Sequence, residues 1–314
     1  VKVFLDYNPW DTGTRREGRD DLDALAAMVG ALEADGIFLD TMNRGAAEFR
    51  AKLDAVRPGV ALEGEIALPL ASLHDQHLSW AQWFHDSAAP GVLRNKWIER
   101  RHMQHQIKRW DRDHSGELHA AWMNGSGVLI WENVFGSWVG WCERDKSILR
   151  AMLPIQRGFE PFFTSDQWTP LVPTEKKDVY ASLWEARGLR LWTLVNRATT
   201  AAQGGLLRVE ARHGERYFDM VAGREIKAAP LDERVMLEGA IGGRAIGCLL
   251  ATTQNPLPKG FDEFLAGQRA VNARAGFETT PNLRETIAVA VKRTKAVKAS
   301  AKGMTPVIGF KGEL

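Results

Sequence analysis

Polar residues that can carry acid–base chemistry follow the apolar runs in the first half of the sequence, at the point where each run ends. Carboxylates that converge on one point repel one another and shift one another's pKa values, a cost that is tolerated where a reaction requires it. Two such carboxylates can hydrolyse a glycosidic bond: one attacks or activates water, and the other protonates the leaving oxygen. In chain order these polar residues are Asp6, Asn8, Asp11, Asp40, Glu63, Glu65, Glu132 and Asn133.

Asp40 and one of two nearby glutamates are the predicted pair. Side chains alternate along a strand, so Glu63 and Glu65 share one face, as do Phe38 and Asp40 on the preceding run. A separation of about 5–5.5 Å between the carboxyl groups suits a retaining glycosidase, and about 6.5–9.5 Å suits an inverting one. A carboxylate at a strand end can also cap the helix that follows, which is the alternative role for each of them.

The elements that would position these residues alternate between strands and helices. Apolar residues recur at helical spacing between Leu22 and Leu32, and Pro58-Gly59 stops a second helix. This alternation is typical of parallel βαβ units, whose strand ends meet at the mouth of a barrel. We therefore expect an α/β fold, part of a (β/α)8 barrel, over residues 1–173. Its expected strands are 2–6, 37–39, 60–62, 92–98 and 128–131, and its expected helices are 22–32, 46–56, 102–110, 117–123 and 148–163.

The beginning of the chain predicts an incomplete barrel. Val1 lies directly in an apolar run, with no initiator methionine, and five candidate strands fall short of the eight that a closed barrel needs. We expect a fragment whose N-terminal strands are missing, with open edges at Val3–Leu5 and at 128–131. The cellular location therefore stays unknown.

Two short segments resemble a known enzyme family. The segment 35–40, Asp-Gly-Ile-Phe-Leu-Asp, and the segment 62–65, Leu-Glu-Gly-Glu, resemble strands four and five of retaining α-glycosidases such as the α-amylase family. The resemblance implies that Asp40 is the nucleophile and Glu65 the acid/base, with Glu63 as the replacement for Glu65. Phe38 stands where that family has an arginine, and the family's Asn-His-Asp triplet is absent.

A longer stretch resembles glycoside hydrolases in architecture. The segment 124–136, Asn-Gly-Ser-Gly-Val-Leu-Ile-Trp-Glu-Asn-Val-Phe-Gly, precedes a helix and a β-rich region. This order is similar to the last barrel strand and C-terminal β-domain of several glycoside hydrolase families, including fucosidase-like and α-galactosidase-like ones. The resemblance implies a barrel followed by an all-β sandwich.

The pattern changes after Pro173 to short apolar runs without long helices between them. Such runs, separated by turn signals, are typical of a β-sandwich, which we expect over residues 174–256. The remainder, 257–314, is expected to be a helix followed by a basic tail or linker. The expected strands of the sandwich are 179–183, 190–196, 205–210, 216–219, 235–237 and 245–250.

Composition narrows the range of partners. A net charge of +2 over 314 residues gives no reason to expect nucleic acid, and no apolar run reaches the roughly 18 residues of a membrane helix. Cys142 and Cys248 are expected to be buried thiols. The sequence has no P-loop or dinucleotide motif, and its histidine pairs lack a third ligand nearby, so no cofactor or metal is expected. The oligomeric state stays unknown.

Three hypotheses of function follow. The first is a glycoside hydrolase whose carbohydrate substrate contacts Asn8, Trp10, Asp11, Glu132 and Asn133. The second is a non-catalytic carbohydrate-binding protein on a degenerate barrel, which would not need two carboxylates within about 10 Å of each other. The third is a barrel lyase in which the same acids surround a metal ion.

Overall fold

The structure is a computed structural model that describes residues 2–11, 20–81, 87–108, 112–130 and 141–274. Its chain forms two compact units. The first unit comprises residues 1–84 and 93–107, and the second comprises residues 85–92 and 108–314. Some of the sequence-based predictions lie outside the described residues. They concern the predicted substrate contacts Glu132 and Asn133, the strand residue Trp131 and the basic stretch beyond residue 275.

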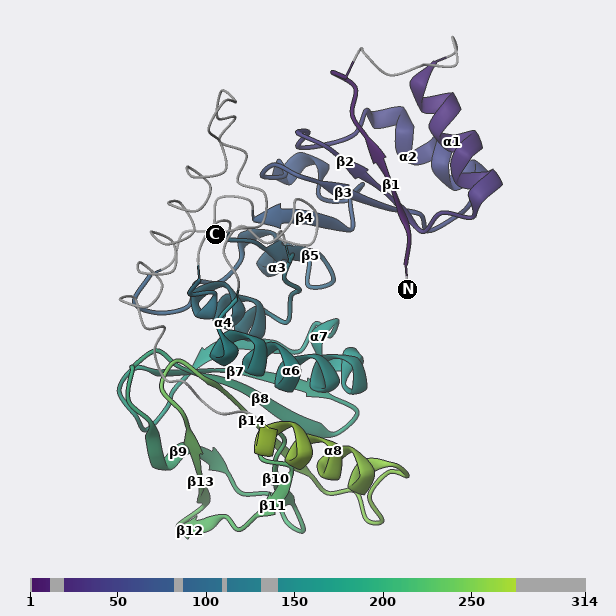
Figure 1. Cartoon of the computed structure of the whole chain (residues 1–314). Coiled ribbons are helices and arrows are strands. Elements are labelled where there is room, and N and C mark those ends of the chain that lie inside the picture. Colours follow the sequence, from purple (N-terminus) through teal and green to yellow (C-terminus); the bar gives the residue numbers. More distant parts are fainter. Residues whose placement is uncertain (1, 12–19, 82–86, 109–111, 131–140, 275–314) are drawn as a thin grey trace, which may run out of the picture. The chain divides into compact units, whose positions relative to one another are not determined.

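A parallel sheet of five strands forms the first unit (Figure 1). Its strands are adjacent in the same order as in the sequence, so β1 and β5 are the two edges. They are β1 (Phe4–Tyr7), β2 (Gly36–Leu39), β3 (Ala61–Gly64), β4 (Leu78–Ala81) and β5 (Met103–Gln106). The helices are α1 (Asp21–Leu32), α2 (Ala47–Val56), the 3-10 helix η1 (Leu70–Ser72) and α3 (Arg94–Ile98). Strand–helix–strand order and parallel pairing agree with part of a (β/α) barrel.

Local sequence explains how this unit is built. The Asp20 side chain caps α1 by accepting hydrogen bonds from the backbone N–H groups of Leu22 and Asp23, at 3.0 and 3.3 Å. One face of α1 then buries Val29 against an apolar cluster from α2 and the sheet. Ile37 is a fully buried member of that cluster. The helix-facing side of the strands is therefore apolar, which leaves the opposite side for the polar residues.

Two of the five strands differ from those expected. The segment 92–98, expected as a strand, contains helix α3, and the segment 102–110, expected as a helix, contains strand β5. Within 128–130 only an isolated bridge at Val128 is present, so the second sheet edge is β5. The expectation for 92–98 failed because this segment has too few apolar residues to distinguish helical from strand periodicity. That for 102–110 failed because polar residues occupy β5.

Helices cover one face of a large sheet in the second unit. They are α4 (Ser115–Asn124), α6 (Glu143–Gly158), α7 (Glu160–Phe163) and α8 (Phe261–Arg274). Gly125 ends α4 in the left-handed conformation with a φ of 58°. Trp122, on α4, is fully buried and donates its indole N–H to the carbonyl of Gly247, at 2.9 Å. The helices and the sheet thus share one core.

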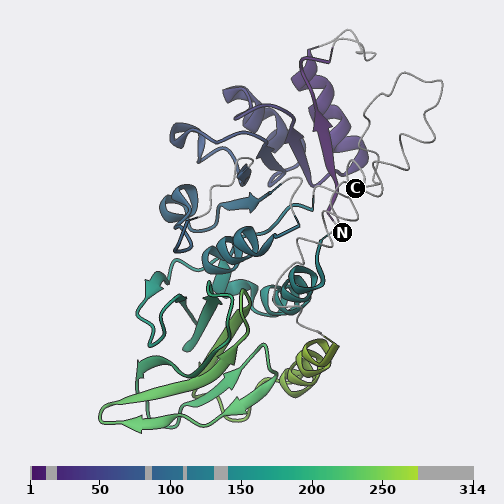
Figure 2. The ribbon, with the colours of Figure 1, turned by 60° about the vertical axis from the view of Figure 1, so that its left-hand side comes forward.

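Two antiparallel sheets complete the second unit (Figure 2). The larger has the order β11-β10-β14-β8-β7-β6, and the smaller has the order β12-β13-β9. One apolar cluster lies between the larger sheet and the helices, and another contains residues of both sheets. The strands are β6 (Trp168–Val172), β7 (Val179–Ala186), β8 (Leu189–Asn196), β9 (Ala202–Glu210), β10 (Arg216–Asp219), β11 (Arg224–Ile226), β12 (Ala229–Leu231), β13 (Arg234–Ile241) and β14 (Ile246–Thr252).

A short segment from the middle of the first unit's sequence belongs to the second unit. Residues 87–92 lie in sequence between β4 and α3, yet they pack with the second unit. Arg197 donates a hydrogen bond to the carbonyl of Ser87, at 2.7 Å, and Asn124 donates one to the carbonyl of Gly91, at 2.8 Å. The first unit is therefore discontinuous in sequence.

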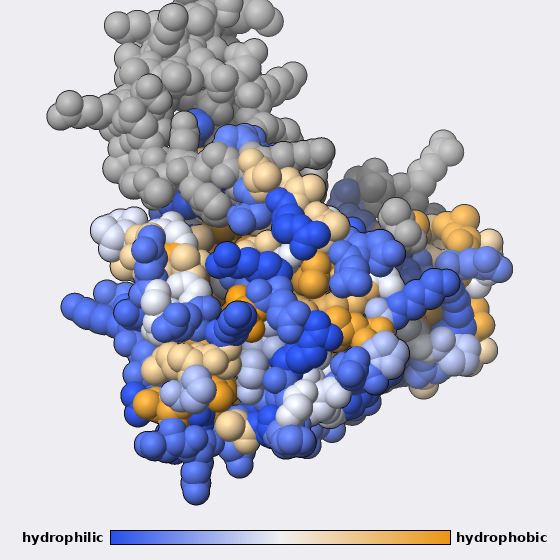
Figure 3. Space-filling model, turned by 90° about the horizontal axis from the view of Figure 1, so that it is seen from below, coloured by the Kyte–Doolittle hydropathy of each residue, from blue (hydrophilic) through white to orange (hydrophobic). Residues whose placement is uncertain are grey.

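Hydrophilic residues dominate the described part of the surface that is seen in Figure 3, with hydrophobic residues in small groups among them. Cys142 and Cys248 are both free and buried, as expected from the sequence. No helix within the described ranges is both long and apolar enough to cross a membrane.

Candidate active site

Three carboxylates lie at the carboxyl ends of β1, β2 and β3. Asp6 lies within β1, Asp40 directly follows β2, and Glu65 directly follows β3. The backbone ladder continues one residue past each strand: the N–H of Asp40 donates to the carbonyl of Tyr7, at 3.0 Å, and the N–H of Glu65 donates to that of Leu39, at 3.3 Å. Regular sheet pairing therefore positions the backbone of Asp40 and Glu65.

Side-chain contacts join these residues into one network. Asp40 and Glu65 share a side-chain hydrogen bond. Asn8 donates to Asp40 Oδ2 at 2.9 Å, and the backbone N–H of Thr41 donates to Glu65 Oε2 at 2.6 Å. Thr41 has a φ of 54°, in the left-handed region that a β-branched residue rarely adopts. Such strain occurs at functional sites, where the surrounding structure holds it in place.

The environment raises the pKa of two of the acids. Burial raises the pKa of Asp40 to about 6, and the hydrogen bond with Glu65 and the charges of Glu65 and Asp6 add to the effect, against the donor from Asn8. Burial and the charge of Glu65 also raise the pKa of Asp6. The neighbouring acids therefore disfavour one another's charged forms, and the cluster holds a proton more readily than separate carboxyl groups would.

Glu63 has a different partner from Glu65. It is 7% exposed, and its Oε1 lies 2.5 Å from Nδ1 of His105 on β5. The register pairs Phe38 with Glu63, and Trp80 with His105, so these residues share the face of the sheet that carries Asp6. Phe38 and Trp80 stack at a centroid distance of 4.5 Å. The face opposite the helices is therefore acidic and aromatic.

The predicted substrate-binding residues of β1 lie beside the acids. Asn8 contacts Asp40 directly, and its Oδ1 accepts the backbone N–H of Asp11, at 3.0 Å. Trp10 donates its indole N–H to the hydroxyl of Thr41, and the residue is 58% exposed. The structure thus brings Asn8, Trp10 and Asp11 together with the predicted catalytic residues.

Sequence reasoning did not assign Asp6, Thr41 or His105 to the site. Asp6 was visible as a carboxylate at a strand end, and its alternation with Asn8 was the signal that could have included it. His105 was placed in an expected helix, which concealed that it faces Glu63. The left-handed conformation of Thr41 has no signal in a single sequence.

Among the described residues, no group of three or more His, Cys, Asp or Glu side chains has the geometry to hold a metal ion. The two histidines of the pair at the start of β5 have separate partners. His102 is buried and lies 2.8 Å from the hydroxyl of Ser79, whereas His105 contacts Glu63.

Solved structures with a similar fold are carbohydrate-active enzymes. An α-amylase from Anoxybacillus has a TM-score of 0.52 at 12% identity, with 75% of this chain and 63% of that chain covered. An α-amylase from Geobacillus thermoleovorans, complexed with acarbose, has a TM-score of 0.53 at 11% identity, with 74% and 63% covered. A cyclomaltodextrinase has a TM-score of 0.50 at 14% identity, with 74% and 48% covered.

The fold is similar to that of amylase-type barrel proteins. The chain spans less than two thirds of the length of these enzymes. No family model matches the sequence, and no curated protein matches it. At such identities the likeness concerns the fold alone, so the chemistry has to be argued from the site.

Proposed function

We propose that this chain is part of a glycosidase that hydrolyses a glycosidic bond with Asp40 and Glu65. The observation that carries the proposal is the contact between these two carboxyl groups at adjacent strand ends, together with the raised pKa of Asp40. Two carboxyl groups in contact disfavour being charged together, so one of them can carry the proton as the acid while the other is ionised as the nucleophile. The carbohydrate-active neighbours of the same fold, one of them complexed with acarbose, add support.

The proposed reaction has two steps. The ionised Asp40 carboxylate attacks the anomeric carbon as the glycosidic bond breaks, and Glu65 donates its proton to the leaving oxygen. Glu65 then removes a proton from water, which attacks the glycosyl ester and releases the sugar and Asp40. A retaining reaction of this kind uses carboxyl groups about 5–5.5 Å apart on either side of the anomeric carbon.

Neighbouring residues have supporting roles in this proposal. Asn8 orients Asp40, and Trp10 offers an exposed aromatic face for a sugar ring. Glu63, paired with His105, remains the replacement for Glu65 as acid/base. Glu132 and Asn133 remain proposed substrate contacts. The domain ranges 1–173, 174–256 and 257–314, with the second as a β-sandwich, are also part of the proposal.

Hydrolysis of a panel of aryl glycosides by the 314-residue chain tests the proposal. Asp40→Asn and Glu65→Gln should each lower kcat/KM at least 1,000-fold, since each removes a group that the reaction uses directly (~4 kcal/mol in the barrier). The matched control is Asp54→Asn, which removes the exposed Arg50–Asp54 pair on α2 and should leave the rate unchanged.

Three outcomes would contradict the assignment. Activity that survives Glu65→Gln but not Glu63→Gln would transfer the acid/base role to Glu63. Activity that survives Asp40→Asn would remove the nucleophile. A chain that binds sugars without hydrolysing any glycoside would be a non-catalytic carbohydrate-binding protein instead.

A further inference from the structure

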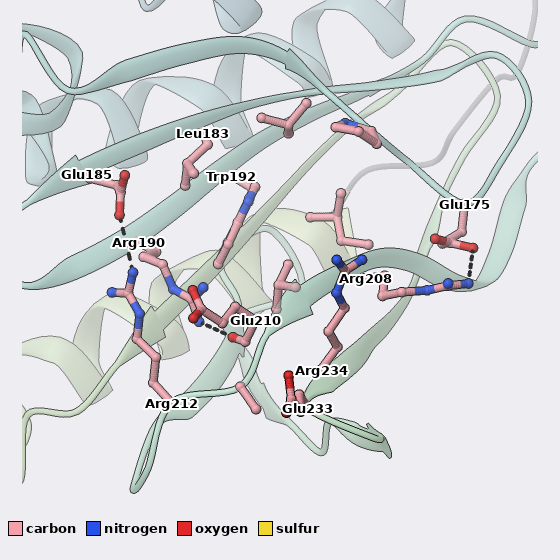
Figure 4. Close-up of a pocket in the computed structure, with 15 residues that line it drawn as sticks. Glu175, Leu183, Glu185, Arg190, Trp192, Arg208, Glu210, Arg212, Glu233 and Arg234 are labelled. Carbon is pink, nitrogen blue, oxygen red and sulfur yellow. Dashed lines mark hydrogen bonds and ion pairs between the residues drawn. The ribbon is translucent and has the colours of Figure 1, made fainter.

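A cavity of about 900 Å³ lies in the second unit, lined by residues of both antiparallel sheets (Figure 4). Its volume is near the upper end of the range of about 300–1,000 Å³ that is typical of ligand pockets. The proposed catalytic residues Asp40 and Glu65 belong to the first unit, and none of the residues that line this cavity does, so the cavity is a separate feature.

The floor of the cavity is apolar and includes an available donor. Leu183, Trp192 and Leu207 line it. Trp192 is 2% exposed, and among the described residues its indole N–H has no hydrogen-bond acceptor. The guanidinium of Arg190 lies over the Trp192 ring, 5.1 Å from its centroid. An oxygen atom of a ligand in the cavity can therefore accept from this indole.

A buried ion pair lies against that floor. Arg190 and Glu215 have side chains that are 5% and 1% exposed. Arg190 donates to Glu215 Oε1 at 3.1 Å and to the carbonyl of Glu210 at 2.9 Å. Tyr217 donates its hydroxyl to Glu215 Oε2 at 2.8 Å, and burial raises the pKa of Tyr217 to about 12. Because these polar groups satisfy one another, the floor is preorganised.

Guanidinium and carboxylate groups occur in equal number around the cavity. Two of the pairs are visible in Figure 4: Arg208 with Glu175, at 3.2 Å, and Arg212 with Glu185, at 3.5 Å. The cavity therefore has no net formal charge from its lining. The charged residues that line it are Glu175, Glu185, Arg190, Arg208, Glu210, Arg212, Glu233 and Arg234.

We propose that this cavity binds a neutral oligosaccharide. A sugar hydroxyl both donates and accepts hydrogen bonds, so it can bridge a carboxylate and a guanidinium that lie side by side. The C–H face of a sugar ring is apolar and matches the floor around Trp192. The proposed ligand class follows from the residues of this cavity alone and does not depend on the proposed hydrolysis.

The charge balance argues against an anionic ligand. Recognition of a carboxylate or phosphate normally uses arginines free to make bidentate contacts. Here three of the four guanidinium groups, those of Arg190, Arg208 and Arg212, already contact carboxylates.

Binding can be measured in the Asp40→Asn variant of the whole chain, so that hydrolysis does not consume the probe. Isothermal titration and saturation-transfer NMR would use maltohexaose, cellohexaose, xylohexaose and mannohexaose, with hexagalacturonate as the anionic probe. We expect one or more of the neutral probes to bind. Trp192→Phe, which keeps the ring but removes the N–H, should weaken that binding about fivefold, and Arg212→Gln should weaken it about tenfold.

The matched control is Arg216→Gln. Arg216 is also part of an exposed Arg–Glu pair in the same unit, with Glu225, but it does not line the cavity. Arg216→Gln should leave the affinity for the neutral probes unchanged. The proposal is overturned if none of the neutral probes binds at 10 mM, if only hexagalacturonate binds, or if Trp192→Phe and Arg212→Gln bind as well as Arg216→Gln. Failure of hydrolysis with binding retained would affect only the glycosidase proposal.

Discussion

At the scale of the residue, the acids of the first unit are held at a cost to stability. Folding brings Asp40 into a partly buried position beside Glu65 and near Asp6, which disfavours its charged form. Nothing in the packing of the apolar core requires this, because the core lies on the other face of the sheet. The arrangement is the kind expected where selection acts on chemistry rather than on stability.

Asp40→Asn should therefore stabilise the protein at neutral pH. The folded-state pKa of Asp40 is raised to about 6, so the folded state binds more protons than the unfolded state as the pH falls from about 6 towards 4. The parent chain thus recovers stability over that range. We expect the variant to be about 1 kcal/mol more stable at pH 7.5, after allowance for solvent screening, and equal to the parent near pH 4.

Urea unfolding at the two pH values measures this difference. Asp54→Asn is the comparison, because hydrogen bonding to Arg50 lowers the pKa of Asp54 and its removal should stabilise nothing. A stability gain for Asp40→Asn that is the same at both pH values would show that ionisation of Asp40 is not its origin.

At the scale of the element, close packing sets tight limits on the end of α4. Gly125 has a φ of 58°, and a Cβ built there would lie 2.6 Å from the ring of Trp184 and 2.9 Å from that of Phe163. Gly125→Ala should cost about 2–5 kcal/mol, since backbone strain and overpacking add. Gly188→Ala is the matched control: its φ is 77°, but nothing lies within 4 Å of the added methyl group.

Chemical denaturation of the two variants separates strain from packing. Gly188→Ala should lower the free energy of unfolding by only about 1 kcal/mol, because conformational strain alone destabilises it. If the two variants lose the same stability, the ring contacts at Gly125 contribute nothing.

The sequence predicted strands where one face alone is apolar or where the run is strongly apolar. β2 and β3 have such runs, and both were located to within a residue or two at each end. β5 reads Met-Gln-His-Gln, and it was missed because its side chains serve polar contacts such as that of His105 with Glu63. β4 reads Leu-Ser-Trp-Ala, and it was missed because the polar Ser79 interrupts its apolar residues.

The candidate site was predictable to a similar extent. A carboxylate after an apolar run identified Asp40 and Glu65 as neighbours, since parallel strands end at one edge. The sequence could not separate the surroundings of Glu63 from those of Glu65, because these depend on which residue lies across the sheet. That residue is His105, which is 42 positions away.

At the scale of the whole molecule, buried histidines should make stability fall in mild acid. Burial lowers the pKa of His119 to about 3 and that of His102 to about 4. The unfolded state therefore binds more protons than the folded state below about pH 6.5, and stability is lost as the pH falls. Protonation would also place a positive charge on His119 beside that of Arg197, whose guanidinium nitrogen lies 3.3 Å from Nδ1 of His119.

Each histidine should cost about 2 kcal/mol between pH 7.5 and pH 5, which exceeds the opposite effect of Asp40. Unfolding by urea across this range, with 15N-edited NMR of the imidazoles, tests the expectation. His119→Gln should reduce the slope, whereas replacement of the exposed His74 by Gln should not. A stability that is constant from pH 7.5 to pH 5 would contradict the burial of both imidazoles.

The packing of residues 87–92 with the second unit has a consequence for synthesis on the ribosome. The nascent chain delivers β1 to β4 first, then a segment whose partners, Asn124 and Arg197, have yet to be translated, and only afterwards β5. The sheet of the first unit gains its last strand while this segment still awaits its packing site. The order in which the segments are translated therefore differs from the order in which the two units can be completed. A nascent chain stalled soon after β5 would contain all five strands of the first sheet and a segment whose packing partners have not yet been made.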